Sequence, residues 1–319
     1  MPAATLPRVM ADGPLAPIIL ESLAGEVEWL PWTTPATPQP DVVALYTYGH
    51  PHVGPALLDQ FPNLKVISNY GVGVDHIDLH AAADRSIPVG NTPGILDGAT
   101  ADMGFTLLLA TARRLVEGDR YARSPDFTVY DPGYMLGTEI HSSKLGIIGL
   151  GRIGAQVAKR ARGFDMQVVY HNRRPRPDLE ATLGVSYAAL DELLATCDFV
   201  MLCCPLSEET RGLIDARALG LMKPTAILIN IARGPVVDTQ ALTDALTKRQ
   251  IAAAGLDVTD PEPLPRNHAL LKLDNVVIAP HLGSATVATR RRMAELSIEN
   301  LRAGLRGQPL LHPVRPAGA

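Results

Sequence analysis

The sequence predicts an α/β protein in which helices cover both faces of a largely parallel sheet. From about residue 145 onward, short apolar runs alternate with helix-favouring segments, which is typical of strands buried on both faces. A glycine-rich turn joins one of these strands to the following helix, and polar side chains come directly after three others. Together these observations predict a doubly wound sheet that binds its ligands beyond the carboxyl ends of the strands.

The first hundred residues predict a smaller α/β region. Strands are expected at 42–46, 64–68 and 88–89, and helices at 55–60 and 79–84. A long helix is expected from about residue 97 or 100 to residue 123, because Met103, Leu107, Ala110 and Leu115 recur at helical spacing. The proline-rich stretch at 31–40 is expected to be a loop.

Six buried strands are predicted in the rest of the chain, followed by one amphipathic helix. The strands are expected at 145–148, 168–170, 199–203, 226–230, 253–258 and 276–279, and the helix at 288–306. Six parallel strands are the number found in a complete Rossmann sheet.

Composition narrows the class of protein. A chain of 319 residues is long enough for two domains, and a net charge of −4 means that no overall basic field attracts nucleic acid. The three cysteines have no C-x-x-C spacing, and their odd number fits a reducing cytoplasm. No metal site is expected. Prolines interrupt the first twenty residues and no apolar run reaches membrane-spanning length. We therefore expect a cytoplasmic protein without a membrane or nucleic-acid partner.

The glycine-rich turn at 149–154 has the pattern G-x-G-x-x-G. In this pattern Gly149 makes the tight turn, Gly151 lets the backbone approach a pyrophosphate, and Gly154 lets the helix pack closely on the strand. The N-terminus of the helix would offer N–H groups to the phosphates. The turn therefore predicts a dinucleotide site.

The end of the next strand carries no acid that could bind a ribose 2′-OH. Asn172, Arg173 and Arg174 stand there instead. Guanidinium groups pair with phosphate in bidentate geometry, so this cluster favours NADP(H), with NAD(H) still possible. The alternative is that the two arginines are a solvated pair at the surface.

Three further segments follow the ends of the fourth, fifth and sixth predicted strands, and they contain Arg233, Glu262 and His281. Strand ends of a doubly wound sheet converge on one crevice, so these side chains are candidates for one site. Arg233 could bind a carboxylate or a polarised carbonyl, and His281 could donate a proton near neutral pH. Glu262 would orient the imidazole and keep a proton available. Each residue taken singly could equally be structural; together they fit the reduction of a 2-oxo acid.

Beyond these motifs, the chain resembles the D-isomer-specific 2-hydroxyacid dehydrogenases over nearly its whole length. The matching stretches are residues 69–78, 91–94, 145–154, 205–212, 230–234, 236–238 and 280–286. The resemblance implies an NAD(P)-dependent oxidoreductase with two Rossmann-like domains, the smaller of them a flavodoxin-like substrate domain. It implies a discontinuous substrate domain at 1–98 and 288–319, a cofactor domain at 99–287, and a homodimer paired through the cofactor domains.

The resemblance also carries over site residues. The catalytic residues would be Arg233, Glu262 and His281, and the substrate would be bound by Val72, Gly73, Val74, Arg233 and His281. The cofactor would be bound by Gly149, Gly151, Arg152, Ile153, Gly154, Asn172, Arg173, Arg174, Pro205, Thr210, Ala232, Asp257 and Gly283. Asp257 could hold either the nicotinamide amide or Arg233.

Within the family, the cluster at 172–174 is similar to that of the NADPH-preferring glyoxylate/hydroxypyruvate (2-ketoaldonate) reductases. The expected reaction is therefore the reduction of a small 2-oxo acid to the D-2-hydroxy acid. Two alternatives stay open: an NAD-linked D-lactate or hydroxyphenylpyruvate-type dehydrogenase, and a dinucleotide-sensing protein similar to a corepressor. Turnover of a 2-oxo acid separates the enzymes from the sensor, and cofactor preference separates the two enzymes.

Overall fold

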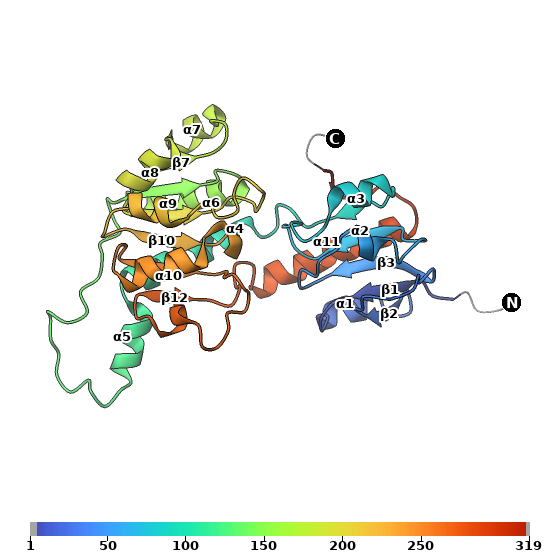
Figure 1. Cartoon of the computed structure of the whole chain (residues 1–319), viewed down its shortest axis with the longest axis horizontal. Coiled ribbons are helices and arrows are strands. Elements are labelled where there is room, and N and C mark those ends of the chain that lie inside the picture. The colour runs from blue at the N-terminus through green and yellow to red at the C-terminus, as the bar shows by residue number, and fades with distance from the viewer. Residues whose placement is uncertain (1–4, 317–319) are drawn as a thin grey trace. The chain divides into compact units, whose positions relative to one another are not determined.

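The chain divides into two compact units in the computed structural model, which describes residues 5–316 (Figure 1). Unit 1 consists of the described residues up to Leu96 together with those from Thr286 onward, and unit 2 is Asp97–Ala285. The domain borders expected from the sequence fall a few residues further along the chain. Residues 1–4 and 317–319, which the expected substrate domain includes, lie outside the described range.

Unit 2 is built on a seven-stranded parallel sheet in the order β12-β11-β10-β9-β6-β7-β8. Its strands are β6 (Lys144–Ile148), β7 (Gln167–His171), β8 (Ser186–Tyr187), β9 (Phe199–Leu202), β10 (Ile227–Asn230), β11 (Ala253–Leu256) and β12 (Val276–Ile278). The six predicted strands are confirmed, while the two-residue edge strand β8 is too short to have been detected. The strand order reverses between β6 and β9, which is where a doubly wound sheet opens to bind ligands.

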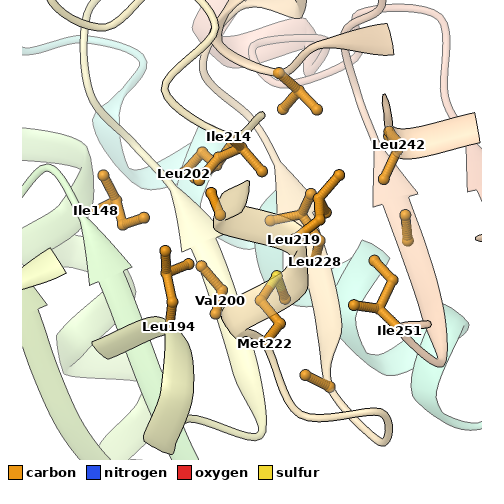
Figure 2. Close-up of a cluster of buried hydrophobic side chains, with 14 of the residues drawn as sticks. Ile148, Leu194, Val200, Leu202, Ile214, Leu219, Met222, Leu228, Leu242 and Ile251 are labelled. Carbon is orange, nitrogen blue, oxygen red and sulfur yellow. The ribbon is translucent and has the colours of Figure 1, made fainter. Parts of the chain in front are cut away.

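Both faces of this sheet are buried. The helices of unit 2 are α4 (Asp97–Ala112), α5 (Leu115–Ala122), α6 (Arg152–Ala161), α7 (Pro177–Leu183), α8 (Leu190–Thr196), α9 (Ala216–Leu221) and α10 (Thr239–Thr247), with 3-10 turns at Arg162–Phe164, Gly234–Val236 and Ala269–Lys272. In β9, Val200 and Leu202 belong to the cluster drawn in Figure 2, whereas Phe199 and Met201 belong to a second cluster. Alternate side chains thus enter two cores, which explains the continuous apolar runs.

The single long helix expected up to residue 123 is wrong, because the chain forms two helices there. α4 ends at Ala112, and Arg114 has the left-handed backbone φ of 51° before α5 begins. The carbonyl oxygen of Ala112 accepts a hydrogen bond from the N–H of Thr138 at 2.8 Å, so it is taken by a returning segment rather than by a further helical turn. The end of α4 thus coincides with a hydrogen bond from Thr138, 26 residues further along the chain. The helical spacing of apolar residues does not reveal such a distant partner.

Unit 1 contains a six-stranded sheet in the order β13-β5-β4-β3-β1-β2, with only β13 antiparallel. Its strands are β1 (Arg8–Ala11), β2 (Glu28–Pro31), β3 (Val42–Thr47), β4 (Val66–Asn69), β5 (Val89–Gly90) and β13 (Pro313–Val314). The parallel part has the order 2-1-3-4-5, which is that of flavodoxin-like folds and confirms the predicted class. The prediction missed β1, β2 and β13.

The helices of unit 1 include one from the far end of the chain. They are α1 (Pro17–Ser22), α2 (Pro55–Leu58), α3 (Leu79–Asp84) and α11 (Val287–Leu305). α11 packs on the sheet, where the Ser68 hydroxyl donates to the Ser297 carbonyl oxygen at 2.7 Å and the hydroxyls of Tyr46 and Ser297 lie 2.6 Å apart. None of the helices within residues 5–316 is long and apolar enough to cross a membrane.

Candidate active site

A histidine and a glutamate meet beyond the ends of β11 and β12. The Nδ1 atom of His281 lies 2.7 Å from Oε1 of Glu262, and both side chains are partly exposed. A carboxylate only accepts hydrogen bonds, so Nδ1 carries the hydrogen and the ring turns Nε2 away from Glu262. The predicted pairing of these two residues is present in the structure. The peptide bonds Asp260–Pro261 and Glu262–Pro263, which surround the glutamate, are both cis.

The backbone around His281 is held by a buried aspartate. The carboxylate oxygens of Asp257 accept hydrogen bonds from the N–H groups of Leu282 at 2.6 Å and Gly283 at 2.8 Å, and the Asp257 carbonyl oxygen accepts from His281 N–H at 2.9 Å. Burial raises the pKa of Asp257, and the two N–H bonds oppose that shift. His281 adopts a left-handed φ of 56° in this loop. Asp257, which was expected among the cofactor contacts, therefore holds the backbone of residues 281–283 in place.

Arg233 follows β10 at the same edge of the sheet. Its side chain is half-buried, and its Nη1 donates to the Ala232 carbonyl oxygen at 3.0 Å. The turn before it is organised by Asn230, which is 1% exposed: Oδ1 accepts from Ala232 N–H and Nδ2 donates to the Arg233 carbonyl oxygen, both at 3.0 Å. Because β10, β11 and β12 are neighbours in the sheet, Arg233, Glu262 and His281 follow the ends of adjacent strands.

The glycine turn has the geometry that a dinucleotide requires. Gly149 has a φ of 102°, and a Cβ added there would lie 2.5 Å from the backbone nitrogen of Cys204. A Cβ on Gly154 would lie 2.3 Å from the Gly149 carbonyl oxygen, so helix α6 packs tightly against the turn. A Cβ on Gly151, by contrast, would meet nothing within 4 Å. The turn thus leaves space beside Gly151, at the start of α6, where a pyrophosphate would fit.

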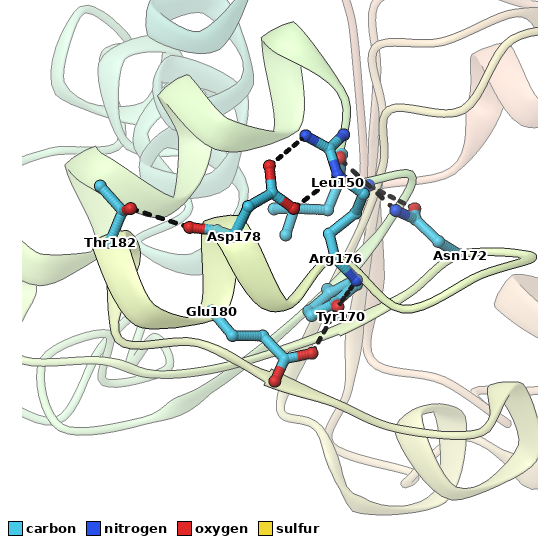
Figure 3. Close-up of polar contacts among 7 residues, drawn as sticks. All are labelled: Leu150, Tyr170, Asn172, Arg176, Asp178, Glu180 and Thr182. Atoms are coloured by element: carbon cyan, nitrogen blue, oxygen red, sulfur yellow. Dashed lines mark hydrogen bonds and ion pairs between the residues drawn. The ribbon is translucent and has the colours of Figure 1, made fainter.

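The segment after β7 is anchored at both ends (Figure 3). Asn172 accepts a hydrogen bond at Oδ1 from Leu150 N–H at 2.7 Å, so this expected cofactor ligand also supports the glycine turn. At the other end, Arg176 N–H donates to the buried Tyr170 hydroxyl at 2.5 Å, which donates to Glu180 at 2.6 Å. Arg173 and Arg174 lie between these anchors, exposed to solvent. Sequence reasoning did not identify Tyr170, because its hydroxyl bonds only become apparent in the fold.

The remaining expected cofactor residues lie around the same strand ends. Arg152 and Ile153 form the first turn of α6, and Ala232 and Gly283 are buried in the loops after β10 and β12. In the loop after β9, the Thr210 hydroxyl donates to the Pro205 carbonyl oxygen at 2.7 Å. The Ser207 hydroxyl and, more weakly, the Arg173 guanidinium lower the pKa of Glu209 in this loop. Arg173 is therefore close enough to the loop after β9 to act on it electrostatically.

Val72, Gly73 and Val74, the expected substrate residues of unit 1, lie in the loop between β4 and α3. All three are half-buried, and they follow the carboxyl end of β4 as ligand-binding loops do in parallel sheets. Within residues 5–316, no cluster of three or more His, Cys, Asp or Glu side chains is arranged to hold a metal ion.

The doubly wound sheet, its glycine turn and the His–Glu pair at its strand ends define a dinucleotide-binding α/β enzyme. The sequence model described as "D-isomer specific 2-hydroxyacid dehydrogenase, NAD binding domain" matches residues 105–283. A glyoxylate reductase of Thermococcus onnurineus is 47% identical over 272 residues, which cover 84% of this chain and 81% of the relative. The chain belongs to the D-isomer-specific 2-hydroxyacid dehydrogenase family.

Solved structures of family members agree with this assignment. An NADPH-dependent glyoxylate/hydroxypyruvate reductase of Sinorhizobium meliloti, in complex with NADP and malonate, matches with a TM-score of 0.89 and 33% identity over 97% of each chain. A D-lactate dehydrogenase of Aquifex aeolicus, in complex with NAD and lactic acid, matches with a TM-score of 0.84 and 30% identity over 94% of this chain and 96% of its own. Enzymes with different cofactors and substrates thus share this fold.

Proposed function

We propose that this protein reduces a small 2-oxo acid of the glyoxylate/hydroxypyruvate type to the D-2-hydroxy acid, with NADPH as the preferred cofactor. The observation that carries the proposal is the 2.7 Å hydrogen bond between Glu262 and His281, which lie at the same edge of the sheet as Arg233. Support for the substrate comes from relatives that are glyoxylate reductases, and support for the cofactor comes from Arg173 and Arg174.

Each residue at the strand ends has a chemical task in this reaction. The nicotinamide of a bound cofactor, held by the glycine turn and the first turn of α6, would supply the hydride for C2. His281, oriented through Nδ1 by Glu262, would donate a proton from Nε2 to the oxygen that becomes the hydroxyl. Arg233 would stabilise negative charge on the substrate, and the N–H groups of Val72, Gly73 and Val74 would bind its carboxylate.

The first test is oxidation of NADPH and of NADH with glyoxylate, hydroxypyruvate, pyruvate, phenylpyruvate and 2-ketogluconate. We expect turnover with a strong bias toward NADPH, and the best substrate identifies the branch of the family. An NADH preference with pyruvate or phenylpyruvate would favour a D-lactate or hydroxyphenylpyruvate-type dehydrogenase. The similarity to the D-lactate dehydrogenase of Aquifex aeolicus is the reason to include these substrates. Tight cofactor binding without any turnover would favour a cofactor-sensing role instead.

Arg173→Ala is expected to weaken the binding of NADPH but not of NADH. The lost interaction is a charge-assisted hydrogen bond to the 2′-phosphate, worth about 1.5–3 kcal/mol, or roughly 10- to 100-fold in affinity. Titration of each cofactor against the intrinsic fluorescence of wild type and variant measures the change. Arg176→Ala is the matched control, because that side chain pairs with Asp178 at 2.6 Å. Equal losses for NADPH and NADH in Arg173→Ala would contradict the 2′-phosphate assignment.

We also propose that two copies of the chain pair through unit 2. α5 and the loop after it extend from the sheet of unit 2 (Figure 1). Both carry large apolar side chains that are exposed to solvent. Val129 is 70% exposed, Tyr130 79% and Leu136 73%. Beside α5, a cleft of about 640 Å³ is lined by apolar and charged residues, among them Leu136, Arg120 and Val276. Exposed apolar surface of this kind is typical of a protein interface, which supports a homodimer.

Tyr130→Asp combined with Leu136→Asp is expected to convert the dimer to a monomer, because each substitution places a charge in the buried interface. Light scattering after size-exclusion chromatography measures the mass directly. Tyr187→Asp, an exposed aromatic residue at the opposite edge of the same sheet, serves as the control. A dimer that survives the double substitution would show that this surface is not the interface.

A further inference from the structure

Two side-chain amides, one of them buried, hold three consecutive carbonyl groups in the loop after β4. Asn69, the last residue of β4 and 1% exposed, donates from Nδ2 to the carbonyl oxygens of Gly71 and Gly73, both at 2.9 Å. Asn91 donates from its own Nδ2 to the carbonyl oxygen of Val72 at 2.8 Å. The carbonyl side of the loop is therefore fixed by two carboxamides.

This arrangement determines where the N–H groups of the loop point. A trans peptide unit carries its C=O and the N–H of the next residue on opposite sides. Turning the carbonyls of residues 71, 72 and 73 toward the asparagines thus turns the N–H groups of Val72, Gly73 and Val74 away from them. No hydrogen-bond acceptor within the described range 5–316 contacts these three N–H groups. Successive outward N–H groups of this kind form a site for an anion.

A second buried residue sets the orientation of the Asn69 carboxamide. Thr47, at the end of the neighbouring strand β3 and 0% exposed, donates from its hydroxyl to Oδ1 of Asn69 at 2.8 Å. If the carboxamide were flipped, Oδ1 of Asn69 would face the carbonyl oxygens of Gly71 and Gly73, and neither of these can donate a hydrogen bond. Thr47 and Asn69 therefore form one hydrogen-bonded relay that ends on the loop backbone.

We propose that Asn69 is a positioning residue for the substrate carboxylate, acting through the loop backbone that it holds and oriented by Thr47. This inference rests on the proposed function, in which the N–H groups of residues 72–74 bind that carboxylate. It adds that the affinity for 2-oxo acids depends on two side chains that do not contact the substrate. Hydrogen bonds to the carbonyls also polarise the peptide units, which strengthens their N–H groups as donors.

The test compares Asn69→Asp and Thr47→Val with the wild type. Asn69→Asp is isosteric but loses both N–H donors, so we expect KM for the best 2-oxo acid to rise about tenfold or more. The Kd of oxalate, a dianion that cannot be reduced, should rise in parallel. The Kd of NADPH should stay close to that of the wild type, because the cofactor is bound by unit 2. The value of kcat should change less than KM does, because the loop binds the carboxylate and supplies neither the hydride nor the proton. Thr47→Val should give a smaller rise in KM, and Thr47→Ser, which restores the hydroxyl, should return KM toward the wild-type value.

Asn275→Asp is the matched control for stability. The Asn275 carboxamide also donates to two carbonyl oxygens, those of Leu246 at 3.2 Å and Ala252 at 3.0 Å, but it lies in unit 2 at the amino end of β12. It should lower Tm while leaving KM unchanged. The inference is overturned if Asn69→Asp and Thr47→Val lower Tm in the same way without changing KM or the oxalate Kd. Failure of the proposed function has a different signature, because then the wild type itself neither reduces a 2-oxo acid nor binds oxalate.

Discussion

Replacement of His281 is expected to lower kcat by about 10²- to 10⁴-fold, the usual contribution of a general acid. The ring is held by Glu262 at 2.7 Å and its backbone by Asp257 at 2.9 Å, so its proton-donating atom has a defined direction. We suggest His281→Asn as the main variant, because the residue has a φ of 56° and asparagine tolerates left-handed backbone better than alanine does. Single-turnover reduction of glyoxylate measures the chemical step.

The same variant should bind NADPH with nearly unchanged affinity and retain the wild-type Tm. Glu262→Gln provides a graded comparison, because it keeps a hydrogen-bond acceptor for Nδ1 but removes the negative charge. The kcat of Glu262→Gln should lie between those of the wild type and His281→Asn, because a neutral amide stabilises a protonated imidazole less than a carboxylate does. Turnover by His281→Asn at a rate close to that of the wild type would show that another group donates the proton.

Gly151→Val is expected to abolish tight dinucleotide binding without destabilising the fold. An added Cβ at this position meets nothing within 4 Å, and the backbone is extended, with φ −95° and ψ −152°. The side chain would instead fill the space beside the start of α6 that a pyrophosphate needs. Losing even two charge-assisted hydrogen bonds to phosphate corresponds to roughly 10²-fold or more in affinity. NADPH and NADH should be affected equally, because both contain the pyrophosphate.

Gly154→Ala separates a binding effect from a folding effect in the same turn. Its Cβ would lie 2.3 Å from the Gly149 carbonyl oxygen, so either the helix or the turn must move. We expect a clear fall in Tm for this variant, measured by differential scanning calorimetry, whereas Gly151→Val should melt close to the wild type. A Gly151→Val protein that binds NADPH with wild-type affinity would show that the pyrophosphate lies elsewhere.

Much of unit 2 could be predicted because its determinants are local in sequence. The apolar runs of β6, β7, β9, β10, β11 and β12 predict buried parallel strands, since strands covered on both faces need apolar residues at every position. The positions of Arg233, Glu262 and His281 directly after three of these strands then predict one site, because parallel strands bring their carboxyl ends to a common edge. β1 and β2 in unit 1 are short and bordered by prolines, so their pattern was too weak to detect.

The sequence by itself determined the fold class, the glycine turn and the three polar residues at the strand ends, because each depends on spacing along the chain. Only the tertiary structure decided the break at Arg114, the support of the His281 loop by Asp257, and the relay from Thr47 through Asn69 to the loop at 71–73. Each of these depends on hydrogen bonds between residues on different elements or loops. Local propensity contains no information about such partners, since the partners become neighbours only when the sheets have formed.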